Sequence, residues 1–290
     1  MLKRISIVFP VHINPYSIAF KRTKLMPELP EVETICRELS NLLIGRKILS
    51  IEPLRENTII YNTELIENQT ISKIERRAKY IVISLSKGQQ LVIHLRMTGK
   101  LIFPITNNFD SKYTRAIIYI DNDDEIHFDD IRCFGKIYIN EQNQTNDQFA
   151  KLGIEPLTDD FNVDFLYQKA KNRNQEIKPF LMNQEIVVGI GNIYVQEILF
   201  HSKINPTRKA KTIKKHEWQK IIYNTKNTLL IAIDNNGTTI SDFRRVDDKT
   251  GEFQNFLQVY GKDNCPICDN KLEYIKQAGR STRYCKECQK

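Results

Sequence analysis

Four cysteines close to the C-terminus constrain this chain more than any other feature of its sequence. The spacing C-x2-C-x16-C-x2-C is formed by Cys265, Cys268, Cys285 and Cys288. Two cysteine pairs at this spacing, joined by a hairpin-length segment, are typical of a tetrahedral zinc site. We therefore predict one structural zinc ion bound by a C-terminal hairpin. Disulfides are the poorer interpretation because the sequence shows no secretory signal.

The residues around these cysteine pairs are basic and partly aromatic. They include Lys271, Lys276, Arg280, Arg283, Tyr284 and Lys286. A zinc-bound hairpin with such a surface suggests a contact with nucleic acid. The alternative is a zinc site that only holds the end of the chain together.

Length and charge limit what the remaining residues can do. A chain of 290 residues can form two or three domains with a substantial core. Five of its eight net positive charges come from the first 25 residues, which contain no acidic side chain. A site for a polyanion must therefore be a local basic patch. No run of 18 apolar residues occurs, so we expect no membrane-spanning segment.

Hydrophobic periodicity divides the chain into three regions. Short strands separated by turns occur over residues 48–139, which predicts an antiparallel sandwich or barrel. The expected strands are 80–85, 91–95, 116–120, 125–128 and 136–139. The pattern becomes helical after Pro156. The expected helices are 164–172, 178–183, 192–201 and 215–235. With the zinc hairpin at the end, this order predicts an α+β fold.

A further helix is expected near the start, where residues 26–33 read MPELPEVE. Pro30 can open this helix, and Glu31 suits its first turn. One interpretation is an ordinary helix packed on the sheet. The other concerns Pro27, because a proline exposed by removal of an initiator methionine has a free secondary amine. Such an amine can attack an electrophilic carbon, with Glu28 beside it as a proton donor or acceptor.

Seven motifs in one order connect the chain to a known family. They are MPELPEVE, RRAKY (76–80), HLRMTG (94–99), DIRCFG (130–135), LGIEPL (152–157), VVGIGNIYVQE (187–197) and the cysteine pairs. Together they resemble the formamidopyrimidine-DNA glycosylases, bacterial enzymes of the endonuclease VIII superfamily that excise oxidised purines and nick the strand as AP lyases. The resemblance covers residues 26–290.

The resemblance implies an antiparallel β-sandwich domain over 27–155, a helix–two-turn–helix module over 156–255 and a zinc finger over 256–290. It implies double-stranded DNA containing 8-oxoguanine or formamidopyrimidines as the partner and substrate. It also implies a monomer that acts in base excision repair in the bacterial cytoplasm.

The resemblance further implies a catalytic set. Pro27 matches the nucleophile, whose amine attacks C1′ of the damaged nucleoside and forms a Schiff base. Glu28 matches the acid–base residue, and Glu31 matches a supporting carboxylate beside it. Lys79 matches a lysine that holds a phosphate at the lesion and supports β-elimination. Arg280 matches an arginine assigned to δ-elimination. By themselves, Lys79 and Arg280 would be ordinary surface cations.

Six residues match positions that contact DNA: Met97, Tyr113, Arg132, Phe134, Arg173 and Asn192. Met97 would fill the place of the extruded base, Arg132 would face the orphaned cytosine, and Phe134 would wedge beside it. Asn192 would bind a backbone phosphate in the GIGN turn. Alternatively, Met97 and Phe134 are core residues, and Asn192 is a plain helix cap.

The chain departs from the family pattern at three places. Cys133 stands where arginine or lysine is common, which removes a positive charge, and Tyr113 stands where a DNA-contacting histidine is often found. The third departure is the segment 1–26, because Pro27 has an amide nitrogen while Met26 precedes it. We expect translation to start at Met26 and the basic extension to be non-native or poorly ordered.

Two other functions remain open. An endonuclease VIII-like enzyme would share the fold but excise oxidised pyrimidines. Leu29–Pro30, and a segment over 241–256 long enough to cap an everted purine, favour the purine branch. The second alternative is a non-catalytic module that binds damaged DNA, which applies if Pro27 is never exposed.

Overall fold

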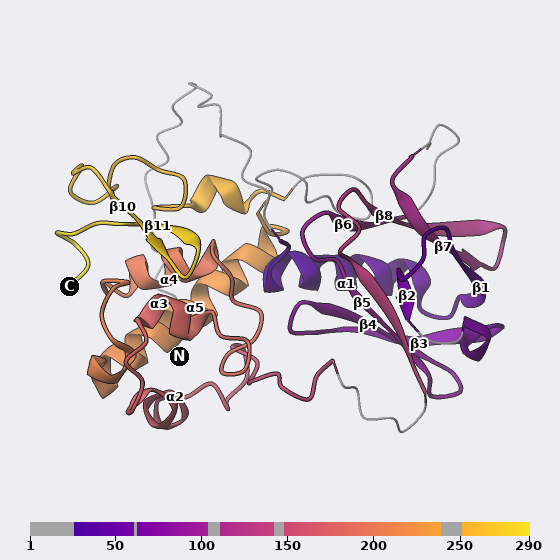
Figure 1. The fold of residues 1–290 in the computed structure, drawn as a ribbon, viewed down its shortest axis with the longest axis horizontal. Helices are drawn as coiled ribbons and strands as arrows, with labels where there is room; N and C mark the ends of the chain where they lie inside the picture. Colours follow the sequence, from indigo (N-terminus) through magenta and orange to yellow (C-terminus); the bar gives the residue numbers. More distant parts are fainter. Residues whose placement is uncertain (1–25, 61–62, 104–110, 142–147, 239–250) are drawn as a thin grey trace, which may run out of the picture.

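The computed structural model describes residues 26–60, 63–103, 111–141, 148–238 and 251–290. The extension expected to be poorly ordered, residues 1–26, lies outside the described residues except for Met26. Most of the expected purine-capping segment, 241–256, also lies outside them. Figure 1 shows a sheet-rich body at one end of the molecule and a helical body with the C-terminal hairpin at the other.

The N-terminal body consists of a helix followed by short strands. In the described residues its elements are α1 (Leu29–Leu43), β1 (Lys47–Pro53), β2 (Ile59–Ile60), the 3-10 helix η1 (Thr63–Ile66), β3 (Gln69–Arg77), β4 (Tyr80–Leu85), β5 (Gln90–His94), β6 (Gly99–Ile102), β7 (Thr114–Ile120), β8 (Asp124–Asp130) and β9 (Lys136–Asn140). Each expected strand forms within two residues of its predicted ends.

The strands hydrogen-bond in the order β2-β9-β5-β4-β3-β1-β7-β8-β6. β1 joins the two halves of this sheet, because Lys47 and Ile48 pair with β3 while Ser50 to Pro53 pair with β7. Apolar residues from both halves share one core with α1. The predicted N-terminal β-domain is thus confirmed. One pair departs from the expected antiparallel pattern, since β2 runs parallel to β9.

α1 forms for the reasons that the sequence gives. Pro30 lies in its first turn, and Glu31 accepts a hydrogen bond from the backbone N–H of Glu28 at 2.8 Å. Its apolar side chains recur at helical spacing and bury one face against β3. Leu43 is fully buried and completes this face, whereas the neighbouring Leu42 is 44% exposed.

The helical body follows. In the described residues it contains α2 (Val163–Ala170), α3 (Ile177–Leu181), α4 (Tyr194–His201), η2 (Ala210–Thr212), α5 (Lys215–Asp234) and η3 (Phe253–Phe256). The hairpin at the C-terminus is made of β10 (Glu273–Gln277) and β11 (Arg280–Tyr284). None of the described helices is both long and apolar enough to cross a membrane.

The longest helix, α5, ends as predicted. It stops just before Asn236 and Gly237, which both adopt a positive φ (58° and 75°) that turns the chain out of the helix. Trp218 on this helix is fully buried against Phe180 of α3. The prediction of helices after residue 156 is therefore confirmed.

α1 belongs to both bodies, and this placement positions the site. Leu29, its first residue, packs in the core of the helical body, whereas its later apolar residues pack in the core of the sheet. α1 also contacts α5 (Figure 1). The segment Met26–Glu28 therefore lies at the junction of the two bodies.

Replacement of Phe134 by alanine tests whether this residue belongs to a core. Phe134 is 52% exposed, so we expect the variant to keep nearly the same free energy of unfolding. The matched control is Phe128→Ala, which removes a fully buried ring and should cost about 3–5 kcal/mol. Denaturant unfolding of both variants measures the difference. A comparable loss in the two would place Phe134 in the core.

Candidate active site

Glu28 is bound by the backbone at the start of α4. Its carboxylate accepts hydrogen bonds from the N–H groups of Gly191 (2.7 Å), Ile193 (2.9 Å) and, at a longer 3.5 Å, Tyr194. A Cβ on Gly191 would lie 2.3 Å from the carboxyl carbon of Glu28, so this close approach requires glycine. Backbone N–H groups at the GIGN turn thus bind the carboxylate of a residue that lies more than 160 positions earlier in the chain.

Burial raises the pKa of Glu28, while the charge of Lys79 and the three N–H groups oppose that shift. A carboxyl group whose pKa is raised takes up a proton more readily than an ordinary glutamate and can return it as an acid. Its position directly after Pro27 places this acid beside the predicted nucleophile. Pro27 itself is buried at the junction of the two bodies.

Glu31, three residues after Glu28, is bound by a separate set of hydrogen-bond donors. Its carboxylate accepts hydrogen bonds from the N–H of Glu28 (2.8 Å), the hydroxyl of Tyr194 (2.5 Å) and the N–H of Thr238 (2.7 Å). Burial, followed by the nearby charge of Glu28, raises the pKa of Glu31 to about 7. Glu31 therefore fixes the backbone at Glu28 and links α1, α4 and the end of α5.

Lys79 points into the same region. Its side chain is buried, and its Nζ donates a hydrogen bond to the backbone oxygen of Ile190 at 3.4 Å. Burial lowers the pKa of Lys79; the charge of Glu28 raises it, and that of Arg280 lowers it further. The alternative of a strand-edge lysine in solvent is therefore wrong.

The turn that presents Lys79 is fixed by a residue that sequence reasoning did not identify. Ala78 adopts a positive φ of 55°, and its N–H donates to Glu155 at 2.7 Å. The same carboxylate accepts bonds from Arg76 (2.7 Å) and Arg77 (2.8 Å). Glu155 belongs to the LGIEPL motif, but nothing in that motif predicts contact with a turn 77 residues earlier in the chain.

Lys178 is a second residue that the sequence did not reveal. It is fully buried, and its Nζ donates to Asn192 Oδ1 (2.7 Å), Thr282 Oγ1 (2.7 Å) and the backbone oxygen of Ser281 (3.1 Å). Burial and the charge of Arg280 lower the pKa of Lys178 to about 8, against the opposite effect of Glu28. A lysine on a short helix is ordinarily expected in solvent.

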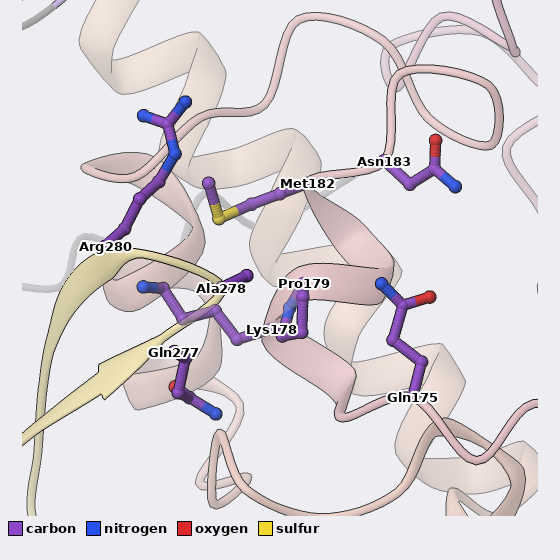
Figure 2. Close-up of a pocket in the computed structure, with 8 residues that line it drawn as sticks. All are labelled: Gln175, Lys178, Pro179, Met182, Asn183, Gln277, Ala278 and Arg280. Atoms are coloured by element: carbon purple, nitrogen blue, oxygen red, sulfur yellow. The ribbon is translucent and has the colours of Figure 1, made fainter.

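A pocket of about 300 Å³ lies between α3 and the zinc hairpin. Figure 2 shows the amine of Lys178 pointing towards the hairpin, with the exposed Arg280 farther along it. Lys178 thereby joins the GIGN turn to β11. Asn192 uses its side-chain oxygen on Lys178, so it is not a plain helix cap.

The three predicted wedge residues lie together. Nη1 of Arg132 is 3.0 Å from Sδ of Met97, and its guanidinium lies 4.8 Å from the ring centre of Phe134. A cavity of about 680 Å³ is lined by Met26, Arg96, Met97, Cys133, Phe134, Lys136, Tyr138 and Arg280. Met97 and Phe134 thus face this cavity, and the interpretation of them as core residues is wrong.

Tyr113 and Arg173, two further predicted DNA-contacting residues, lie outside the lining of that cavity. The backbone oxygen of Tyr113 accepts from the N–H of Asp130 at 2.9 Å, two residues before Arg132. Its ring lies close to the cations of Lys112 and Arg115, at 5.4 and 5.9 Å. Arg173 is exposed just beyond α2, and its Nε donates to the backbone oxygen of Lys169 at 3.1 Å.

The four cysteines fit a zinc ion. Their Sγ atoms all lie within 4.8 Å of one another. A zinc ion with four Zn–S bonds of about 2.3 Å needs sulfur atoms about 3.8 Å apart. The Cys265–Cys288 and Cys268–Cys285 pairs are separated by 3.8 and 3.5 Å. The predicted structural zinc site is therefore confirmed, with thiolates at all four positions.

Comparison with known proteins agrees with this geometry. Residues 26–137 match the formamidopyrimidine-DNA glycosylase N-terminal domain, and residues 152–244 match the H2TH domain of the same enzymes. The formamidopyrimidine-DNA glycosylase of Legionella pneumophila (strain Lens) is 42% identical over 271 residues, covering 91% of this chain and 98% of the relative. That of Pelotomaculum thermopropionicum is 38% identical over 274 residues, covering 91% and 99%.

The chain belongs to the formamidopyrimidine-DNA glycosylase family. Solved structures of the family have the same fold. The MutM (Fpg) protein from Thermus thermophilus superposes with a TM-score of 0.84 at 31% identity, covering 91% of this chain and 98% of that one. A point mutant of the Lactococcus lactis Fpg, in complex with a Fapy-dG containing DNA, superposes with a TM-score of 0.85 at 33% identity, covering 91% and 99%.

Removal of one zinc ligand tests the role of the hairpin in this family member. Cys285→Ser leaves three thiolates, so we expect the protein to lose zinc and DNA binding while its N-terminal sheet stays folded. Metal analysis and fluorescence anisotropy with a duplex measure both effects. Cys133→Ser, at a thiol outside the cluster, is the control and should keep its zinc. Full DNA affinity in the metal-free variant would contradict this prediction.

The pKa of Glu31 predicts a pH dependence of stability. The folded-state pKa of about 7 is above the reference value of 4.5, so the stability that this group adds is complete below about pH 4.5. This contribution to the free energy of unfolding, about 3 kcal/mol, is lost as the pH rises from about 4.5 through about 7. Glu31→Gln removes this titration. The difference in unfolding free energy between variant and parent should therefore shift in favour of the variant across this window, whereas a constant difference would disprove the assignment.

Proposed function

We propose that the protein is a base-excision-repair DNA glycosylase that removes oxidised purines from double-stranded DNA and nicks the strand by β,δ-elimination. The observation that carries this proposal is the meeting of Glu28, Glu31 and Lys79 beside Pro27 at the junction of the two bodies. Related proteins support the substrate class. Members of the family have been solved with Fapy-dG containing DNA, with abasic-site DNA and, for MutM, with carbocyclic 8-oxo-G containing DNA.

The proposed chemistry begins at Pro27 when this residue is first in the chain. Its secondary amine attacks C1′ of the damaged nucleoside, and the base departs with the electron pair of the broken bond and gains a proton. The attacking amine loses its proton, and Glu28 gives a proton to O4′ as the C1′–O4′ bond breaks, which opens the sugar ring and forms the Schiff base. Loss of the C2′ proton from the resulting Schiff base then expels the 3′ phosphate, which Lys79 holds. A second elimination expels the 5′ phosphate, with Arg280 at the zinc hairpin.

The remaining site residues are proposed to grip and deform the duplex. Met97, Arg132 and Phe134 enter the gap left by the extruded nucleotide, since extrusion costs a few kcal/mol of stacking and pairing. Met97 and Phe134 line one cavity and Arg132 contacts both of them, which supports this role. The phosphate contacts are assigned to Tyr113, Arg173 and Asn192.

A second candidate function is excision of oxidised pyrimidines. One observation supports retaining it, because a structure of wild-type Lactococcus lactis Fpg contains an oxidised pyrimidine in its DNA. Parallel assays on duplexes with 8-oxoguanine and with an oxidised cytosine separate the two. Faster release of the purine supports the proposal, and faster release of the pyrimidine overturns it.

We also propose the domain limits 27–155, 156–255 and 256–290. The apolar clusters of the sheet, the helices and the hairpin, most of whose members fall within these limits, support this division. The proposed working form is a monomer in the bacterial cytoplasm, where reducing conditions keep the four zinc-binding cysteines as thiols.

The identity of the nucleophile is tested with two forms of the chain. An amide nitrogen has no free lone pair, because resonance delocalises it into the carbonyl. Protein that begins at Pro27 should excise 8-oxoguanine, nick the strand and form a covalent adduct that borohydride traps. Protein that retains residues 1–26 should bind the same duplex and form no adduct.

The mass of each protein should be verified before the assay, because any removal of residues 1–26 would blur the comparison. Strand cleavage by verified full-length protein at the rate of the shortened form would exclude Pro27 as the nucleophile. Lys79 would then be the first alternative. If neither form cleaves but both bind, the non-catalytic module is the correct description.

A further inference from the structure

One buried carboxylate binds the backbone at both ends of the wedge loop, residues 131–134. Asp130 is the last residue of β8 and is fully buried. Its Oδ1 accepts a hydrogen bond from the N–H of Arg132 at 3.1 Å, and its Oδ2 accepts one from the N–H of Gly135 at 2.7 Å. These two bonds fix both ends of the loop, so the side chains of Arg132 and Phe134 extend from a backbone that Asp130 holds.

The same carboxylate also reaches the turn that carries Met97. The hydroxyl of Thr98 donates to Oδ1 of Asp130, and Oγ1 of Thr98 accepts from the N–H of Arg132 at 3.0 Å. Thr98 and Asp130 are both buried, and Gly99 of β6, the residue after Thr98, pairs directly with Asp130. A closed set of hydrogen bonds therefore joins the Met97 turn to the wedge loop.

The side chains of the three wedge residues also contact one another. Arg132 bridges Met97 and Phe134 through the sulfur and ring contacts described above. Between Arg132 and Phe134, Cys133 adopts a positive φ of 59°, a conformation that is unfavourable for a residue with a Cβ. Such a backbone persists where surrounding bonds determine it, and the two bonds to Asp130 are on either side of Cys133.

We propose that Asp130 is a positioning residue that holds Met97, Arg132 and Phe134 as one preassembled body, with Thr98 as its link to Met97. This inference rests on the proposed function. A wedge that is already ordered before it meets DNA loses less side-chain and loop freedom when it enters the duplex. Loss of the link should therefore slow base extrusion and leave the chemistry at the sugar intact.

The chain offers a matched control in the neighbouring residue. Asp129 is equally buried, but its carboxylate accepts from the hydroxyls of Ser111 (2.5 Å) and Thr114 (2.8 Å) and from no described residue of the wedge loop. Asp129→Asn and Asp130→Asn thus make the same change on the same strand. A general loss of stability at β8 would affect both variants alike.

The first experiment compares two substrates under single-turnover conditions with saturating zinc-loaded protein that begins at Pro27. Asp130→Asn should slow excision of 8-oxoguanine from an intact duplex by about 10- to 100-fold, the loss typical of a misplaced group. Cleavage at a preformed abasic site, which has no base to extrude, should change far less. Asp129→Asn should slow neither step to that extent. Equal losses in the two variants, or on the two substrates, would overturn the proposal.

Substitutions at Thr98 test the link without touching the carboxylate. Thr98→Val removes the hydroxyl while keeping the shape, and it should slow excision in the same selective way. Thr98→Ser restores the hydroxyl and should restore the rate. These variants keep the proposal testable if Asp130→Asn does not fold. Equal rates for Val and Ser would disprove the role of Thr98.

A binding readout separates this proposal from the proposed function. The full chain is mixed with a duplex that contains 2-aminopurine next to the lesion, whose fluorescence rises when the neighbouring stack is opened. Asp130→Asn should lower this rise at equal occupancy, and Asp129→Asn should not. If the parent protein excises no lesion, the proposed function fails, yet this signal still decides whether Asp130 orders the wedge.

Discussion

The contact between Glu28 and the start of α4 is the interaction on which the site depends. The acid comes from the segment before α1, and its three backbone donors come from a turn more than 160 residues later in the chain. A helix N-terminus suits a carboxylate because its free N–H groups carry partial positive charge. The contact therefore joins the two bodies and places Pro27 at their junction. It also leaves room only for glycine at position 191.

Buried charges surround this contact, and each is compensated by groups from another element. Glu28 and Glu31 face Lys79 and backbone donors, while Lys178 donates hydrogen bonds to uncharged acceptors on the GIGN turn and β11. Burial shifts all four pKa values towards the neutral forms. Proton transfer and Schiff-base chemistry require acids and bases with such shifted pKa values, so the same burial that costs stability prepares the site for catalysis.

Local pattern predicted the elements well because their signals are local. β4 was placed from its short apolar run, α5 from its helical periodicity, and the zinc site from cysteine spacing alone. Lys178 and Glu155 were not found because their partners are far away in sequence, and Asp130 because its link to the Met97 turn runs through Thr98, 32 residues earlier. Lys178, for example, meets Thr282, 104 residues later. The short motifs indicate that these regions are functional, but only the structure shows which atoms are in contact.

The position of α1 in two cores has a further consequence for folding. Leu29 completes the helical core, while Val32 and the apolar residues after it complete the core of the sheet. The apolar core of each body is incomplete without side chains from α1. Glu28 and Glu31, which cap this helix, lie where α1 passes from one core to the other. The two bodies are thus coupled through α1, because local opening of one withdraws this helix from the other, and we expect them to unfold together.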